Sequence, residues 1–102
     1  MADSKQFSPD KDAIKQFQIQ PNIGNHLALQ LVTAGITSID QLRDIGSETA
    51  FIRLNEMDNS QCINSLYALE GAIQGIRWHS LEKTRKRELL DFFNQVKGGV
   101  EK

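Results

Sequence analysis

The most apolar stretch of the chain, residues 61–79, places the strongest constraint on its fold. Its large apolar residues recur three or four positions apart, which puts them on one stripe of a helix. These residues are Cys62, Ile63, Leu66, Leu69, Ile73 and Ile76. The segment also contains Gly71 and Gly75, although glycine destabilises a helix by about 1 kcal/mol relative to alanine. We therefore expect a central helix from Gln61 to His79, capped by Ser60, against which another backbone packs closely.

Length and composition fit one small soluble domain. The 102 residues are 39% hydrophobic and 25% charged, with a formal net charge of -1, whereas a dedicated nucleic-acid binder is usually basic. A single cysteine excludes an internal disulfide and fits a reducing compartment. No apolar run is long enough to span a bilayer, and the N-terminus has no apolar signal core. We therefore expect a cytoplasmic protein that does not enter a membrane and does not bind DNA tightly on its own.

Capping and turn residues divide the rest of the chain into short helices. Ser8–Pro9–Asp10 predicts a first helix start, and that helix must end before Pro21. Gly35 is expected to end the next helix, while Ser38, Ser47 and Ser80 are placed to cap later ones. Including the central helix, the expected later helices span residues 25–34, 39–44, 48–56, 61–79 and 81–95.

A short internal repeat predicts two similar turns. Ile23–Gly24 is followed by Ala28, and the same pattern recurs 22 positions later as Ile45–Gly46 followed by Ala50. The isoleucine can fill the gap between two helices, and the glycine allows positive φ. This is the layout of a helix-hairpin-helix motif, present once or twice.

These patterns together predict an all-α domain of about five helices, because no segment shows sustained alternation of apolar and polar residues. We expect three parts along the chain. Residues 1–18 form a polar N-terminal extension with a possible short helix, residues 19–97 form the helical domain, and residues 98–102 form a frayed tail.

Several of these segments, in the same order, resemble the C-terminal domain of the TfoX (Sxy) family. The matching segments are Pro21–Gly24, Ala34–Ile36, Leu42–Gly46, Leu66–Ile73, Gly75 and Trp78–His79. The resemblance implies a non-enzymatic regulatory domain, because the family is associated with control of DNA-uptake (competence) genes together with other transcription factors. Full-length members carry a separate N-terminal domain, whereas only 18 residues precede the match here, so a different role stays open.

The turns of the hairpins are candidate phosphate sites. Free backbone amides at a turn and at the next helix N-terminus attract anions, so Gly24, Asn25 and His26 could contact DNA. The first hairpin has no Lys or Arg beside it in the sequence, and these turns could equally serve only to connect helices. At the second hairpin Glu48 would repel a phosphate, which favours a structural role for Ile45 and Gly46, as we expect also for Ile23.

A basic cluster near the C-terminus is the second candidate binding site. Its members are Arg77, Lys83, Arg85, Lys86 and Arg87. They could meet DNA or an acidic partner. Alternatively they form a solvated helix face, in which Glu82 supports Lys86 four residues later.

Glu70 lies on the apolar stripe, where a carboxylate needs partners. We expect it to be structural and to bind hairpin amides, Trp78, or an arginine such as Arg77 or Arg53. No second acid stands at a catalytic spacing, and His26, His79 and Cys62 lack zinc-type spacing. Gly71 and Trp78 are expected to serve packing.

The sequence thus predicts no catalytic residue, no cofactor and no metal. It favours a transcriptional co-regulator that makes weak DNA contact, binds a transcription factor, or does both. The alternative is a helical protein-interaction module without direct nucleic-acid binding.

Overall fold

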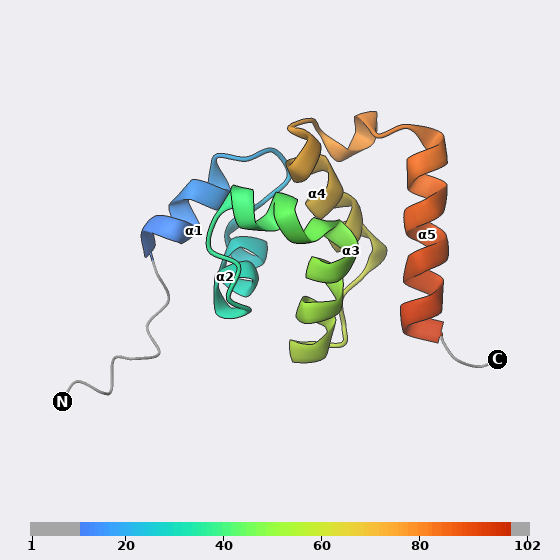
Figure 1. Cartoon of the computed structure of the whole chain (residues 1–102), viewed down its shortest axis with the longest axis horizontal. Helices are drawn as coiled ribbons and strands as arrows, with labels where there is room; N and C mark the ends of the chain where they lie inside the picture. Colours follow the sequence, from blue (N-terminus) through green and yellow to red (C-terminus); the bar gives the residue numbers. More distant parts are fainter. Residues whose placement is uncertain (1–10, 99–102) are drawn as a thin grey trace.

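The computed structural model describes residues 11–98, which form five α-helices and one 3-10 turn. The elements are α1 (Lys11–Gln18), α2 (Asn25–Thr33), α3 (Ile39–Met57), α4 (Ile63–Gln74), η2 (Trp78–Ser80) and α5 (Lys83–Gly98). Residues 11–98 contain no strand, so the expected all-α fold is confirmed. Figure 1 shows α1 and α2 at one end, α5 at the other, and α3 and α4 between them. No helix within the described range is long and apolar enough to cross a membrane.

The core lies chiefly between α3 and α4, which make the most extensive contact in the fold. Leu66 and Leu69 are fully buried, as the apolar stripe predicted. Ala13 and Phe17 of α1 are also buried, so the short helix in the expected N-terminal extension contributes to the core. The predicted helix start at Ser8–Pro9–Asp10 and most of the predicted tail lie outside the described residues.

The central helix α4 is shorter than predicted at both ends. It begins at Ile63 with an exposed Cys62 as N-cap, because the Ser60 hydroxyl bonds instead to Asp58 Oδ1 at 2.6 Å. It ends at Gln74, where Gly75 takes φ 75°. The N–H of Ile76 then donates to Gly71 O at 2.9 Å, a pattern typical of a glycine-terminated helix. The chain beyond Gly75 therefore leaves the helix.

The bend within α3 confirms the predicted break at the second Ile–Gly pair. Gly46 has φ 85° and ψ 162°, and Figure 1 shows the helix turning sharply. Ser38 caps the first half as expected, since its hydroxyl accepts from Gln41 N–H at 3.1 Å. Gly24 instead has φ -91° and ψ -172°, so the predicted positive φ at the first pair is wrong. Asn22, with φ 75°, makes that turn.

The Asn22 side chain joins the turn before α2 to the segment after α4. Its Nδ2 donates to Ile76 O at 2.8 Å, and its Oδ1 accepts from Trp78 N–H at 3.0 Å. A Cβ at Gly71 would lie 2.4 Å from Asn22 Nδ2 and 2.9 Å from Ile76 O. The predicted close approach at Gly71 is therefore confirmed. Gly75 has nothing within 4 Å of its Cβ position, so the close approach expected there is wrong.

The last helix packs beside α3 and α4 through a few apolar side chains. Leu89 is fully buried, and the Phe93 ring lies 5.8 Å from that of Phe51 on α3. Ser80 does not begin α5 as expected, because it belongs to η2. Glu82 accepts the first helical bond, from Lys86 N–H at 2.9 Å.

We predict that Gly71→Ala lowers the free energy of unfolding by about 1–3 kcal/mol, because its new Cβ must displace Asn22 or nearby backbone. Urea denaturation followed by circular dichroism measures the change. Gly24→Ser is the control, since Gly24 has negative φ and open space around it, and it should change stability by a few tenths of a kcal/mol. Equal stability of Gly71→Ala and the wild-type chain would contradict the close approach.

Candidate functional site

Glu70 is held by three donors from three helices. Its carboxylate accepts from Ser47 Oγ at 2.6 Å, Gln74 Nε2 at 2.7 Å and Arg85 at 3.1 Å. Burial raises the pKa of this carboxyl, but the hydrogen bonds and the charge on Arg85 outweigh that effect, so the pKa lies below its ordinary value. The expected partner class, an arginine, is present, but it is Arg85 rather than Arg77 or Arg53. Ser47, which we expected to cap a helix, uses its hydroxyl to donate to Glu70.

Arg85 differs from the other members of the predicted basic cluster. Its guanidinium lies 3.1 Å from Glu70, 3.0 Å from Glu88 and 3.5 Å from Glu48. The hydrogen bond with Glu70, followed by that with Glu88, raises the pKa of Arg85. Three carboxylates thus surround this charge, which makes Arg85 a poor phosphate contact. Glu48, which we expected to repel a phosphate at the second Ile–Gly turn, pairs here with Arg85.

Lys86, Arg77 and three rings form what we call the aromatic–basic surface: Tyr67, Arg77, Trp78, His79 and Lys86. Trp78 stacks on Tyr67 with centroids 5.5 Å apart and on His79 at 4.1 Å. Lys86 Nζ lies 5.5 Å from the Trp78 ring centroid, a distance at which a cation is attracted to the ring face. Arg77 is exposed at the edge of this group.

The remaining basic residues of the cluster, Lys83 and Arg87, lie four residues apart on α5 and are exposed. They line a shallow hollow together with Thr84 and Glu88. The cluster is therefore divided into three parts: the paired Arg85, the aromatic–basic surface, and the Lys83–Arg87 face of α5.

The turn before α2 and the first residues of α2 expose Gly24, Asn25 and His26. Gly24 is the N-cap of α2 and supplies no side-chain cap, so the amides of the first turn are open to an anion. The Asn22 bonds to Ile76 and Trp78 hold the backbone of Arg77 beside this turn. This proximity could not be predicted from the sequence, because 53 positions separate Arg77 from Gly24.

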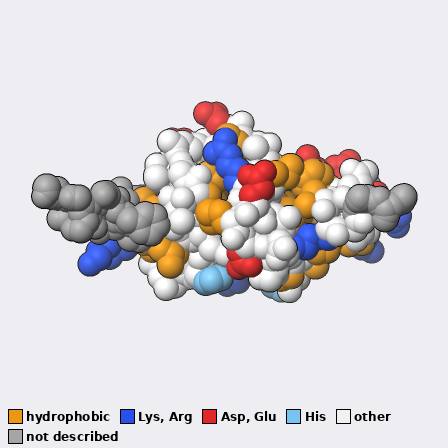
Figure 2. Space-filling model, turned by 90° about the horizontal axis from the view of Figure 1, so that it is seen from below, with side chains coloured by type: hydrophobic (Ala, Val, Ile, Leu, Met, Phe, Trp, Pro, Cys, Tyr) orange, Lys and Arg blue, Asp and Glu red, His pale blue; other side chains and the backbone are white. Residues whose placement is uncertain are grey.

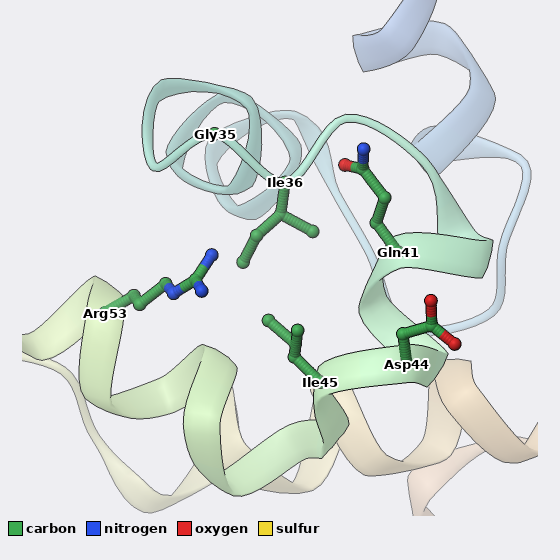
Figure 3. Close-up of a pocket in the computed structure, with 6 residues that line it drawn as sticks. All are labelled: Gly35, Ile36, Gln41, Asp44, Ile45 and Arg53. Atoms are coloured by element: carbon green, nitrogen blue, oxygen red, sulfur yellow. The ribbon is translucent and has the colours of Figure 1, made fainter.

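A cavity of about 210 Å³ lies on the α2–α3 side of the molecule. Figure 3 shows Ile36 and Ile45 pointing toward each other, with the Arg53 guanidinium directed between them. Gly35, Gln41 and Asp44 complete the lining. The sequence analysis placed Ile45 at a structural turn and missed this cavity. Its walls come from the loop between α2 and α3 and from both halves of α3.

Charges of both signs are interspersed on the surface that Figure 2 shows. Lys and Arg side chains stand as separate patches there, with acidic side chains between them. This face therefore offers local contacts rather than a continuous basic stripe.

Among residues 11–98, no group of three or more His, Cys, Asp or Glu side chains is placed to hold a metal ion.

We predict that Arg85→Ala destabilises the fold by about 1.5–3 kcal/mol, because it leaves the buried Glu70 carboxylate short of a charged donor. Chemical denaturation measures the loss. Arg87→Ala removes the same charge from an exposed position two residues away and should change stability by at most about 0.5 kcal/mol. Similar losses in both variants would contradict the special role of Arg85.

The depressed pKa of Glu70 also predicts a pH-dependent contribution to stability. The contribution is complete above the ordinary glutamate pKa of about 4.3 and is lost as the pH falls through the lower folded-state value. The stability difference between the wild-type chain and Glu70→Gln should therefore shrink on acidification from pH 7 to pH 3. Glu56→Gln, at an exposed position of α3, serves as the control and should change stability by at most about 0.5 kcal/mol. A Glu70→Gln difference that grows toward low pH would contradict the assigned direction.

Comparison with known proteins places this fold in a family. The model of the TfoX C-terminal domain matches residues 13–93. Protein Sxy of Escherichia coli (strain K12) is 33% identical over 76 residues, which cover 74% of this chain and 36% of that protein. DNA transformation protein TfoX of Haemophilus influenzae (strain ATCC 51907 / DSM 11121 / KW20 / Rd) is 29% identical over 76 residues, covering 74% and 35%. The chain thus spans about a third of the length of these relatives.

Two crystal structures of proteins of unknown function from Listeria monocytogenes have the same fold. The triclinic form is 45% identical with a TM-score of 0.81, and the alignment covers 84% of this chain and 98% of that one. The tetragonal form is 48% identical with a TM-score of 0.76, covering 78% and 98%. With the family match over most of its length, this chain belongs to the TfoX C-terminal domain family.

Proposed function

We propose that this chain is a non-enzymatic regulatory domain that acts as a transcriptional co-regulator through a weak DNA contact. Membership of the TfoX C-terminal domain family supports a regulatory role, and one relative is named as a DNA transformation protein. Because the chain spans only about a third of that relative, its role is argued from its own surface. Such a role requires access to DNA, in keeping with the cytoplasmic location expected from the sequence.

The single observation that carries the proposal is the bridge formed by the Asn22 side chain, which hydrogen-bonds to Ile76 O and to Trp78 N–H. It holds the backbone of residues 76–78 beside the turn that precedes α2, a helix whose first turn has no side-chain cap. Amides at a helix N-terminus and a nearby guanidinium are both suited to phosphate oxygens. Gly24, Asn25, His26 and Arg77 would then contact one stretch of the DNA backbone.

Lys86 extends this side of the molecule, and the Lys83–Arg87 face of α5 adds a further possible contact. Two near-parallel rings already pack on Trp78, so its role here is to position Lys86 rather than to stack on a base. With two or three phosphate contacts, log affinity should fall with log salt concentration with a slope of about −2 to −3.

A protein-interaction module without nucleic-acid contact is the second candidate. The cavity between Ile36 and Ile45, with Arg53 directed into it, favours this function, because an apolar floor with a few polar and charged groups around it suits a partner side chain. The interspersed charges of Figure 2 also suit a protein partner, such as a transcription factor.

Titration of labelled duplex DNA at several salt concentrations tests the first candidate. We expect a dissociation constant in the range of about 10⁻⁴–10⁻⁶ M at physiological salt. Arg77→Ala should weaken binding and reduce the magnitude of the salt slope by about one. Arg53→Ala is the matched control, because it removes the same charge from another exposed position.

No binding at tens of micromolar protein and low salt would eliminate direct DNA contact and leave the interaction module. Equal losses of DNA affinity in Arg77→Ala and Arg53→Ala would instead show that the contact depends on net charge and not on the position of Arg77. Co-purification with a defined transcription factor, lost in Arg53→Ala, would favour the second candidate.

A further inference from the structure

A second cavity of about 210 Å³ lies between the start of α2 and the start of α4. Its walls come from α2, from the α3–α4 loop and from the first turn of α4. Its lining includes His26, Asp58, Gln61, Cys62 and Ser65. This cavity plays no part in the proposed DNA contact, apart from the position of His26 at its rim.

Gln61 is the unexplained residue of this cavity. It is only 6% exposed, yet its side-chain amide has no hydrogen-bond partner within residues 11–98. A buried amide without a partner loses its hydrogen bonds to water and gains nothing in exchange. Because Gln61 lines the cavity, a polar ligand held there would supply the missing partner.

Cys62 stands beside this amide as the N-cap of α4, with its side chain exposed. Burial raises the pKa of its thiol, but the backbone amides of Ser65 and Asn64 outweigh this, and the pKa lies below its ordinary value. The charged or titratable groups around it are His26 on α2, Asp58 on the loop, and Lys97 of α5, which bonds to Asn59 O of that loop. A thiol at a helix N-terminus is a better nucleophile when such amides stabilise its thiolate.

We propose that Cys62 is a modification site that reacts with a low-molecular-weight disulfide bound in this cavity. The Cys62 thiolate attacks one sulfur of the disulfide, a new S–S bond forms, and the original S–S bond breaks. The displaced thiolate takes a proton from solvent, so the small disulfide is the only oxidant needed. The Gln61 amide holds a polar group of that disulfide, as a peptide-like thiol compound would offer.

The experiment follows the reaction of the full chain with glutathione disulfide by mass spectrometry from pH 5 to 9. The control chain carries Cys62→Ser and Asn94→Cys, which moves the single thiol to an exposed position in the middle of α5. The wild-type rate should reach half its maximum below about 8.5, the ordinary thiol pKa. At pH 7 it should exceed the control rate by about threefold for each unit of lowered pKa, because the thiolate fraction rises while its nucleophilicity falls.

Gln61→Leu tests the cavity separately from the thiol. It should slow the reaction with glutathione disulfide by about fivefold, the loss expected for one hydrogen bond. Its alkylation by iodoacetamide, which needs no such contact, should keep the wild-type rate and pH midpoint. Equal rates with glutathione disulfide in Gln61→Leu and wild type would overturn the ligand site. A wild-type pH midpoint equal to that of the control chain would overturn the reactive thiol, whether or not Gln61→Leu folds.

Discussion

The two hydrogen bonds of the Asn22 side chain hold the N-terminal end of this small fold against its middle. They join the turn before α2 to backbone atoms of Ile76 and Trp78, more than fifty positions away. Asn22 makes both bonds with its backbone at positive φ, a conformation in which asparagine is enriched among non-glycine residues. They also require a residue without Cβ at Gly71. The α1–α2 unit is thereby fixed against the end of α4 by polar contacts as well as apolar packing.

A second polar network fixes the other end of the molecule. Ser47 on α3, Glu70 on α4 and Arg85 on α5 meet in one hydrogen-bonded group. A carboxylate removed from water is tolerated because charged and neutral donors replace the lost hydration. The same ion pairs neutralise the charge of Arg85. The guanidinium that holds α5 against α3 and α4 therefore adds nothing to the strength of a phosphate contact.

The parts of the fold governed by local rules could be predicted from the sequence. The break at Gly46, the cap at Ser38 and the buried Leu66 and Leu69 follow from glycine φ, capping and helical periodicity. The end of α4 at Gly75 was missed because an apolar pattern continues through Ile76. Asn22 gave no signal, since its partners are set by tertiary contacts. The same holds for the choice of Arg85 over Arg77 as the partner of Glu70.

The size of the proposed DNA contact decides what kind of regulator this domain could be. Two or three phosphates neutralised by a chain of net charge -1 give an affinity in the non-specific range of about 10⁻⁴–10⁻⁶ M at physiological salt. Such a contact reads no base edges and cannot select one site among the roughly 10⁶–10⁹ competing sites of a genome. In the proposed role, selectivity would come from a second protein bound at the same time, which would raise the effective concentration of the domain near its site. A co-regulator that contributes one weak contact beside a partner is the arrangement this surface can sustain.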